Sequence, residues 1–103
     1  GRASDQMKIL TFTPAAEADL DRIWEYSFER WGLGQAERYL KEIRDTCRAL
    51  AADRKRGRVA DVRPGYLKYP SGAHVIYFRD HGDRLEIVRI LHGKQDVQRH
   101  LVQ

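Results

Sequence analysis

The sequence predicts a small α+β domain in which an N-terminal strand and an antiparallel pair of helices pack on a small antiparallel sheet. Apolar residues recur every three or four positions in two stretches of the first half, and at every second position in the second half. The predicted order is strand, helix, helix, strand, strand, strand, then a short tail or helix. The helix pair must cover one face of the sheet to bury both apolar stripes. We assign one domain to residues 7–103, because 103 residues suit a single core, and interpret the polar residues 1–6 as a cloning remnant.

The first helix is predicted to follow a strand at Lys8–Thr13, where apolar residues lie among β-favouring threonines. Thr13 can cap the helix through its hydroxyl group. Pro14 suits the first helical position, because the N–H that proline lacks would have no partner there. The apolar stripe of this helix consists of Ala16, Leu20, Ile23, Trp24, Ser27 and Trp31.

Gly32 and Gly34 are expected to stop the first helix and to form a tight corner, after which a second helix runs to about Ala52. The short connection makes the two helices antiparallel neighbours. The helical spacing of Trp24, Trp31 and Tyr39 indicates core residues, although Trp31 at the corner can also be partly exposed and touch a partner. The stripe of the second helix consists of Ala36, Tyr39, Leu40, Ile43, Cys47 and Leu50.

The second half begins with a basic link at Arg54–Arg58, after which the apolar period changes to two. A strand is predicted at Tyr66–Tyr69 and is ended by Pro70-Ser71-Gly72. Another is predicted at His74–Arg79. Its alternation places Ile76 and Phe78 on one face and Val75 and Tyr77 on the other.

The last strand is predicted at Arg84–His92, after a hairpin turn at Asp80–Asp83. It is apolar on both faces, so we place it near the middle of the sheet. The tail from Lys94 to Gln103 can form a helical turn or two.

The composition excludes several classes of protein. Cys47 is the only cysteine, so the chain can form no internal disulfide, and a lone thiol suits a reducing cytoplasm. Its place on an apolar stripe indicates a small core residue rather than a nucleophile. No signal-peptide pattern and no apolar run near the roughly 20 residues of a membrane span occur, and no nucleotide-binding or hydrolase motif is present. We therefore expect no membrane association, no cofactor and no catalytic residue.

Positive charge is concentrated in the second half of the chain. Residues 1–52 carry 8 Lys/Arg against 9 Asp/Glu, whereas residues 53–103 carry 11 against 6, a net charge of +5. If the helices cover one face of the sheet, the other face or its rim holds most of these cations, interleaved with Tyr66, Tyr69 and Tyr77. Such a surface suits phosphates and bases, or an acidic peptide, or is simply a solvated sheet face. Its expected members are Arg58, Arg63, Lys68, Arg79, Arg89, His92 and Lys94.

Two residues of the last strand carry the most information. Arg89 lies between apolar neighbours, so it must be paired or face a groove; a structural ion pair, with Glu86 or Asp61, and a functional role are equally weighted. His92 ends the strand and could move a proton. His92, Asp96 and His100 have a spacing that permits a metal site, but without a fourth ligand we expect a solvated helix end and no metal.

Four stretches give the sequence a resemblance to the ParE toxins of the ParE/RelE superfamily, from Met7 onward. They are Phe12–Trp24, with its Thr-Pro-Ala-Ala start, then Gln35–Tyr39, then Arg63-Pro64-Gly65 with His74–Phe78, and last Ile87–Asp96. The last, Ile-Val-Arg-Ile-Leu-His-Gly-Lys-Gln-Asp, is the most specific.

The resemblance implies a RelE/ParE-like fold and a cytoplasmic toxin of a type II toxin–antitoxin system. It implies inhibition of DNA gyrase by binding, without catalysis, and neutralisation in a hetero-oligomer by a ParD-like antitoxin. The antitoxin would lay an acidic C-terminal segment on Trp31, Tyr39, Arg58, Arg63, Tyr77, Arg79 and Arg89. Gyrase binding or toxicity would rest on Arg89, His92, Lys94, Gln95 and Asp96.

An enzymatic alternative remains open. RelE-like relatives share the fold and cut mRNA on the ribosome, and Arg63, Lys68, Arg79, Arg89 and His92 could fill the corresponding cationic and acid–base roles. The ending Leu91–Asp96 is closer to the ParE branch, and the tail lacks the late Tyr of several RelE-type members. A nucleic-acid-binding module is a third possibility on charge alone, but we expect no direct specific binding of nucleic acid.

Overall fold

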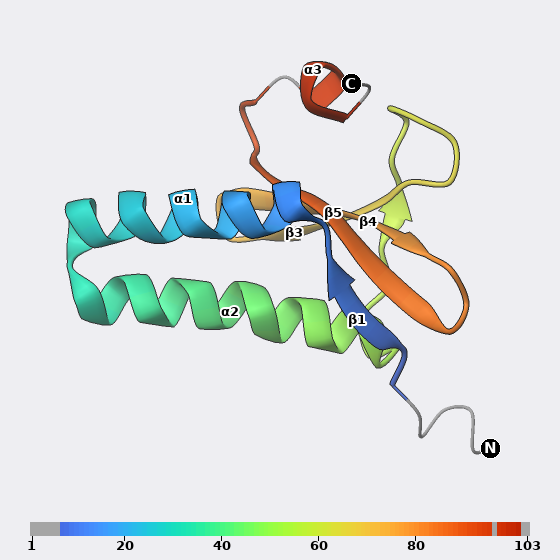
Figure 1. The fold of residues 1–103 in the computed structure, drawn as a ribbon, viewed down its shortest axis with the longest axis horizontal. Helices are drawn as coiled ribbons and strands as arrows, with labels where there is room; N and C mark the ends of the chain where they lie inside the picture. The colour runs from blue at the N-terminus through green and yellow to red at the C-terminus, as the bar shows by residue number, and fades with distance from the viewer. Residues whose placement is uncertain (1–6, 96, 102–103) are drawn as a thin grey trace.

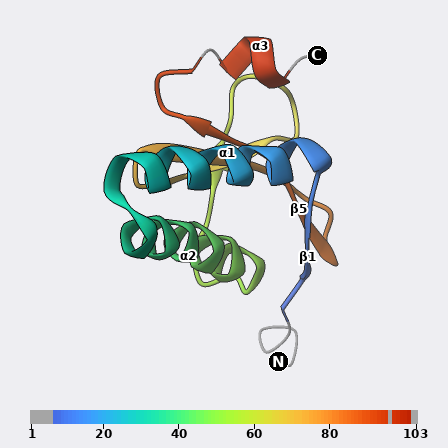
Figure 2. The same cartoon turned by 60° about the vertical axis from the view of Figure 1, so that its left-hand side comes forward.

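The computed structural model describes residues 7–95 and 97–101, so the interpretation of residues 1–6 lies outside the described residues. A pair of long helices lies along one side of a twisted five-stranded sheet, and a short third helix lies on the other side (Figures 1 and 2). In chain order the elements are β1 Ile9–Phe12, α1 Pro14–Trp31, α2 Leu33–Ala51, β2 Arg58–Val59, β3 Leu67–Ser71, β4 His74–Asp80, β5 Arg84–His92 and α3 Val97–Leu101.

The predicted α+β architecture is confirmed, but the sheet is mixed. The strands run in the order β1-β5-β4-β3-β2, and β3, β4 and β5 form the expected antiparallel meander. β1 lies beside β5 and runs parallel to it, so the expectation of a purely antiparallel sheet was wrong for this strand. Strand β5 therefore has a neighbour on each side, which agrees with its apolar character on both faces.

The start of α1 is as predicted. The Thr13 hydroxyl accepts a hydrogen bond from the Ala16 N–H at 3.0 Å, and Pro14 occupies the first turn. The same hydroxyl donates to the Val88 carbonyl of β5 at 2.7 Å. Thr13 thus caps the helix and ties its first turn to the sheet.

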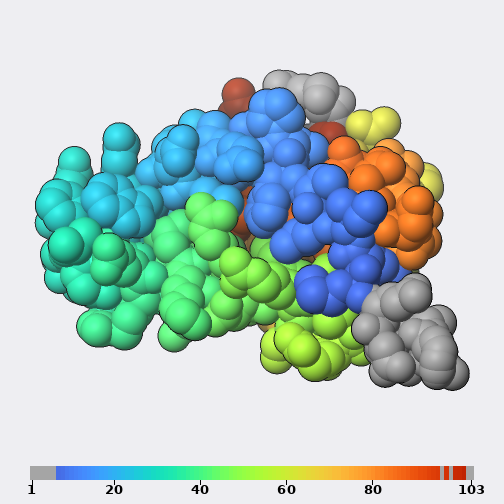
Figure 3. Space-filling model, turned by 60° about the horizontal axis from the view of Figure 1, so that its bottom comes forward, coloured from blue at the N-terminus to red at the C-terminus, as the bar shows by residue number. Residues whose placement is uncertain are grey.

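A single glycine makes the corner between the helices. Gly32 has a φ of 90°, which a glycine adopts without steric cost, and α2 begins at the next residue. The expectation that Gly34 also forms the corner was wrong, because Gly34 lies in the first turn of α2. The space-filling view shows the two helices packed side by side, with the hairpin tip projecting to the left of the sheet (Figure 3).

The structure adds a strand that was not predicted, and it shifts the bounds of β3. Part of the basic link forms β2, whose two residues pair with Leu67 and Lys68. β3 continues through Pro70 to Ser71 rather than ending at Tyr69. β2 stops short of Pro70, so the proline lies where β3 is the outer strand, a position at which proline is tolerated.

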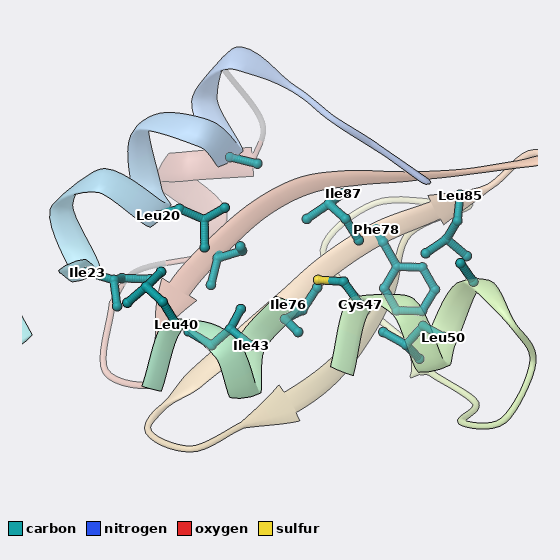
Figure 4. Close-up of a cluster of buried hydrophobic side chains, with 13 residues drawn as sticks. Leu20, Ile23, Leu40, Ile43, Cys47, Leu50, Ile76, Phe78, Leu85 and Ile87 are labelled. Atoms are coloured by element: carbon teal, nitrogen blue, oxygen red, sulfur yellow. The ribbon is translucent and has the colours of Figure 1, made fainter. Parts of the chain in front are cut away.

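The main core lies between the helix pair and the sheet (Figure 4). Cys47 is fully buried there, as its place on the apolar stripe predicted. The two faces of β4 also follow the predicted alternation, with Ile76 and Phe78 in this core and Tyr77 on the opposite face. The labelled side chains of the core are Leu20, Ile23, Leu40, Ile43, Cys47, Leu50, Ile76, Phe78, Leu85 and Ile87.

A smaller apolar cluster lies on the other face of the sheet. Tyr77 and Leu91 are buried there beneath Leu101 of α3 and Ala60 of the loop that follows β2. The predicted helical turn in the tail therefore exists, and it covers sheet surface that would otherwise be exposed. Partly buried residues around the cluster are Val62, Tyr66, Val75, Val88 and Val97.

A β-bulge lets β5 contribute to both clusters. Tyr77 pairs with Arg89, but the next residue, Phe78, pairs with Ile87, so Val88 is an extra residue in β5. The bulge changes the phase of the alternation, and Ile87 and Ile90 both face the main core. This change of phase explains why apolar residues in β5 do not follow a strict alternation.

Asp19 of α1 closes the edge of β5 beyond the end of β1. Its carboxylate accepts hydrogen bonds from the Ile90 N–H at 2.8 Å and from Nε and Nη2 of Arg89, each at 2.8 Å. Arg22 adds another at 2.8 Å. Asp19 is only 4% exposed, and it satisfies both the Ile90 N–H, which no neighbouring strand covers, and the partly buried Arg89 side chain.

Burial alone would raise the pKa of the Asp19 carboxyl group. The hydrogen bonds from Arg89 and the Ile90 N–H outweigh burial, and the pKa lies below its ordinary value of 3.8. A carboxyl group whose pKa is lower in the folded state stabilises the fold above its unfolded pKa. This stabilisation is lost as the pH falls through the folded value.

We predict that Asp19→Asn lowers the free energy of unfolding by about 3 kcal/mol at neutral pH, because it leaves the Arg89 guanidinium without its counter-charge in a buried site. Urea denaturation measures the loss. Asp21→Asn, at an exposed position on the same helix, is the control and should change stability by less than about 0.5 kcal/mol. The difference between wild type and Asp19→Asn should shrink below about pH 4. Equal losses for the two variants would contradict the role given to Asp19.

Candidate functional site

A groove lies between α1, the start of α2 and the end of the sheet where β4 begins and β5 ends. It consists of two adjoining hollows of about 300 and 340 Å³, which share Tyr26, His74 and His92. Trp31 and Tyr39 complete its wall beside the hairpin tip. We call it the histidine groove. Helix packing supplies its aromatic wall and the β4–β5 pairing supplies its histidines.

Tyr39 ties α2 to the turn between β3 and β4. Its hydroxyl oxygen lies 2.6 Å from Nδ1 of His74, accepts from the Ala73 N–H at 3.0 Å and can donate to the Ser71 carbonyl at 3.3 Å. Gly72 lets the tyrosine approach this closely, because a Cβ at that position would lie 2.5 Å from the Tyr39 ring. The half-buried Tyr39 also packs against the main core, as predicted.

His74 and His92 face each other across the β4–β5 ladder. The two residues are paired in register, and their rings meet edge to face with centroids 5.4 Å apart. Burial lowers the pKa of His74, and the neighbouring His92 lowers it further. His74 is therefore predominantly neutral at neutral pH in the free protein.

Hydrogen bonds hold the turn after β5 against the groove. The His92 N–H donates to Oε1 of Gln95 at 2.6 Å, and the Lys94 N–H donates to Nδ1 of His92 at 3.1 Å. The Gly93 N–H donates to the Ala73 carbonyl at 3.0 Å. The structure thus brings His92, Lys94 and Gln95 together, as their sequence proximity implied, while Asp96 lies outside the described residues.

The hairpin tip carries exposed aromatic side chains. Trp31 is 56% exposed, so its interpretation as a core residue was wrong and the alternative of partial exposure is correct. It meets Tyr26 edge to face at 6.2 Å, and the Arg30 guanidinium lies within 6 Å of both rings. Trp24 is half-buried against the core and stacks on Phe28.

A separate cationic face lies on the side of the sheet away from α1 and α2. Lys68 pairs with Arg58 and Tyr77 in the ladder, and alternation places Arg79 on the same side. The Tyr66 ring lies between the guanidinium groups of Arg63 at 6.0 Å and Arg79 at 5.6 Å. Within residues 7–95 and 97–101, no ion pair joins these cations to a carboxylate. The cationic face comprises Arg58, Arg63, Lys68 and Arg79.

The expectation that three tyrosines interleave with these cations was wrong. Tyr66 does lie among them, but Tyr69 packs against the main core on the helix side. Tyr77 is only 5% exposed, because Ala60 and Leu101 cover it. The strand alternation separates Tyr69 from the other two, and the position of α3 could not be deduced from the strand pattern.

Arg89 belongs to the scaffold and is not part of the cationic face. Its ion-pair partner is Asp19, so the expectation of Glu86 or Asp61 was wrong. The carboxylate and the guanidinium are 70 residues apart in the chain. Nothing in the local sequence indicated this partner, apart from an acidic residue on an otherwise apolar helix face.

Two arginines hold the end of α3. Nη1 of Arg63 donates to the Leu101 carbonyl at 3.3 Å, and Nη1 of Arg89 lies 3.4 Å from the His100 carbonyl. Cations at a helix C-terminus are favourable because the carbonyl groups there lack partners within the helix. Arg63 and Arg89 therefore help keep α3 over Tyr77.

Cys47 is not placed to act as a nucleophile. Burial raises the pKa of the Cys47 thiol to about 12, so it is neither accessible nor ionised at neutral pH. Among residues 7–95 and 97–101, no three His, Cys, Asp or Glu side chains are placed to hold a metal ion together.

In the same residues, no helix has the length and apolarity needed to cross a membrane.

Tyr26 and His74 are among the members of the histidine groove that sequence reasoning missed. Tyr26 lies off the apolar stripe of α1, a position typical of a solvated residue. His74 begins a strand, and its position opposite His92 follows only from the register that the bulge at Val88 sets. The pairing of the two predicted strands could have revealed this, because an antiparallel hairpin places the start of the first strand beside the end of the second.

The helical hairpin on a mixed sheet defines a small α+β protein whose exposed features are an aromatic, donor-lined groove and a cationic face. The model of the family described as "ParE toxin of type II toxin-antitoxin system, parDE" matches residues 10–97, and the chain therefore belongs to this family. The predicted resemblance to the ParE toxins is confirmed.

Two relatives and one solved structure give the extent of the similarity. The chain is 42% identical over 91 residues to Toxin ParE1 of Mycobacterium tuberculosis, covering 86% of this chain and 93% of that protein. It is 40% identical over 96 residues to Toxin ParE1 of Caulobacter vibrioides, covering 92% and 99%. A chain from a solved structure described as "Chromosomal ParDE TA system from P. aeruginosa" is similar with a TM-score of 0.74 and 27% identity, covering 84% of this chain and 96% of that one.

We predict that Cys47 does not react with a thiol reagent such as DTNB in the native protein, because the side chain is buried and its pKa is raised to about 12. The same reagent should label it fully once guanidinium chloride unfolds the chain. Rapid labelling of the native protein at neutral pH would show that the helix–sheet core opens on the time scale of the assay, contrary to the packing described.

Proposed function

We propose that this protein is a toxin that inhibits DNA gyrase by binding it, without catalysis, and that a ParD-like antitoxin neutralises it in a cytoplasmic hetero-oligomer. Residues 7–103 form the single toxin domain. The observation that carries the proposal is the match to the ParE family over residues 10–97. The similar solved structure is described as a ParDE system, which supports an antitoxin partner.

The cationic face supports the antitoxin part of the proposal. Arg58, Arg63 and Arg79 project from one side of the sheet without carboxylate partners among the described residues, so an acidic segment laid there gains long-range attraction and register. Trp31 and Tyr39 would contact the same partner at the histidine groove. Tyr77 and Arg89 would support antitoxin binding indirectly. Tyr77 is buried below the cationic face, and Arg89 is paired with Asp19.

The turn after β5 is the proposed gyrase contact. His92, Lys94 and Gln95 are exposed on a turn that four hydrogen bonds hold in place. Arg89 fixes the strand from which this turn emerges, through its pair with Asp19. Asp96, which lies outside the described residues, completes the proposed contact by sequence proximity.

The geometry gives little support to ribonuclease action, the alternative function. Cleavage needs cations and an acid–base group around one phosphate. His92 pairs with His74, whereas Arg79 lies five residues further along β4, which is about 17 Å at the usual rise of a strand. Asp19 neutralises Arg89, and α3 covers the sheet face between these residues. His92 and Arg79 therefore cannot act on the same phosphate in this arrangement.

We predict that the purified protein inhibits supercoiling by DNA gyrase in the absence of ribosomes, because gyrase is the proposed target. An agarose-gel supercoiling assay measures the effect, and prior addition of the antitoxin encoded beside the gene should abolish it. Cleavage of translated mRNA with no effect on supercoiling would contradict this proposal and favour the enzymatic alternative.

We predict that Arg58→Glu combined with Arg79→Glu slows association with the antitoxin by about tenfold or more at low salt, because both changes reverse charge on the cationic face. Stopped-flow or surface-based kinetics measures the rate. The pair Arg44→Glu and Arg48→Glu on the exposed side of α2 changes the net charge equally and is the control. An equal effect in both double variants would mean that net charge, rather than this face, steers the antitoxin.

A further inference from the structure

The polar atoms free to bind in the histidine groove are mainly hydrogen-bond donors. The carboxylate of Asp19 at its edge already accepts from Arg22, Arg89 and the Ile90 N–H. The amide oxygen of Gln95 accepts from the His92 N–H, and that of Gln35 accepts from Arg38. What remains available on the two glutamines consists of N–H groups, and among the described residues that line the groove the only carboxylate is that of Asp19, which is already paired.

His74 can present a donor to the groove in both protonation states. When the Tyr39 hydroxyl donates to Nδ1 of the neutral ring across 2.6 Å, the ring proton is on Nε2, the nitrogen on the opposite side of the ring. When Nδ1 also gains a proton, it can donate to the Tyr39 oxygen, and the tyrosine can turn its own proton to the Ser71 carbonyl at 3.3 Å. This network can therefore accommodate a charged His74 without leaving a polar atom unpaired.

His92 has a different partner at Nδ1. That nitrogen accepts a hydrogen bond from the Lys94 N–H at 3.1 Å, so the proton of the neutral ring is on Nε2. The partner of Nδ1 in His92 is thus an N–H group, whereas Nδ1 of His74 faces the Tyr39 oxygen, which can accept a hydrogen bond. Of the two histidines, His74 is therefore the one whose Nδ1 has an acceptor ready for a second proton.

We propose that the histidine groove binds a carboxylate of the antitoxin's acidic segment, and that binding places a proton on His74. The inference rests on the proposed antitoxin binding and names the chemistry of one contact within it. The aromatic walls formed by Tyr26 and Trp31 would pack against the apolar part of the same segment, in the manner of a helix or strand anchored by one polar group.

The charged and titratable groups around His74 decide whether its pKa rises or falls when the groove is occupied. Burial is the main factor that disfavours a charge on His74 in the free protein, and His92 of β5 adds to it. Arg22 and Arg30 of α1 also line the groove. Asp19 favours the charge but is already paired. The remaining titratable neighbours are Tyr26 and Tyr39, with His100 linked through Gln95. A carboxylate entering the groove adds the counter-charge that is missing, and the pKa of His74 rises in the complex.

Binding linked to proton uptake depends on pH in a defined direction. The association constant rises as the pH falls from the His74 pKa of the complex towards that of the free protein, and it levels off outside this window. Uptake of one proton gives a change of at most about tenfold per pH unit.

The experiment is calorimetric titration of the full-length protein with the antitoxin encoded in the neighbouring reading frame, between about pH 5.5 and about pH 8.5. Repeating it in two buffers of different ionisation enthalpy gives the number of protons taken up. We expect uptake approaching one proton within the window and tighter binding at the acidic end.

Three histidine variants separate the groove from general effects of pH. His74→Gln keeps an N–H near the Nε2 position but cannot be charged, so it should remove both the proton uptake and the rise in affinity at low pH. His92→Gln keeps an N–H donor at the groove and leaves His74 in place, so the pH dependence should survive. His81→Gln changes a histidine that pairs with Glu86 in the β4–β5 turn, outside the groove, and is the matched control.

The outcomes distinguish the inference from the function on which it rests. Tight binding with no proton uptake, or a pH dependence that persists in His74→Gln, would overturn the carboxylate site and leave antitoxin binding intact. Absence of binding at every pH would overturn both. Thermal unfolding of each variant checks that the loss of pH dependence is not a loss of fold.

Discussion

The contact between Asp19, Arg89 and the Ile90 N–H is the constraint on which the rest of the structure depends. β1 covers β5 only as far as Ile87, and beyond that point α1 takes the place of a strand. A helix cannot continue a β-ladder, so side chains must satisfy the exposed backbone, and Thr13 and Asp19 do so from the first two turns of α1. The position of the helix hairpin relative to the sheet is thereby fixed at its buried end.

This constraint separates the exterior into two surfaces. Arg89 lies between the cationic face and the histidine groove and keeps them apart. It pairs with Asp19 on one side and lies near the end of α3 on the other. The groove is lined with aromatic rings and donors, whereas the cationic face consists of guanidinium and ammonium groups that no carboxylate among the described residues pairs. A partner that engages both must wrap around the end of the sheet, as an extended or partly helical segment can.

Local patterns in the sequence predicted most of the elements, because Thr13, Pro14 and the apolar periodicities act over a few residues. They failed where distant residues decide the outcome. The parallel pairing of β1, the bulge at Val88 and the burial of Tyr77 under α3 all depend on contacts across the fold. The same limit applies to the site: the role of Asp19 and the opposition of His74 and His92 follow from register, which single-residue reasoning does not reach.

Native-state hydrogen exchange at the Ile90 amide tests the central claim most directly. This amide lies at an edge of β5 that no strand covers, and the Asp19 carboxylate accepts from it. We predict that it exchanges as slowly as the amides of the central strand β4, through global unfolding alone. Exchange at the rate of an exposed turn, with β4 still protected, would mean that Asp19 does not close the edge of the sheet and that the account of the scaffold is wrong.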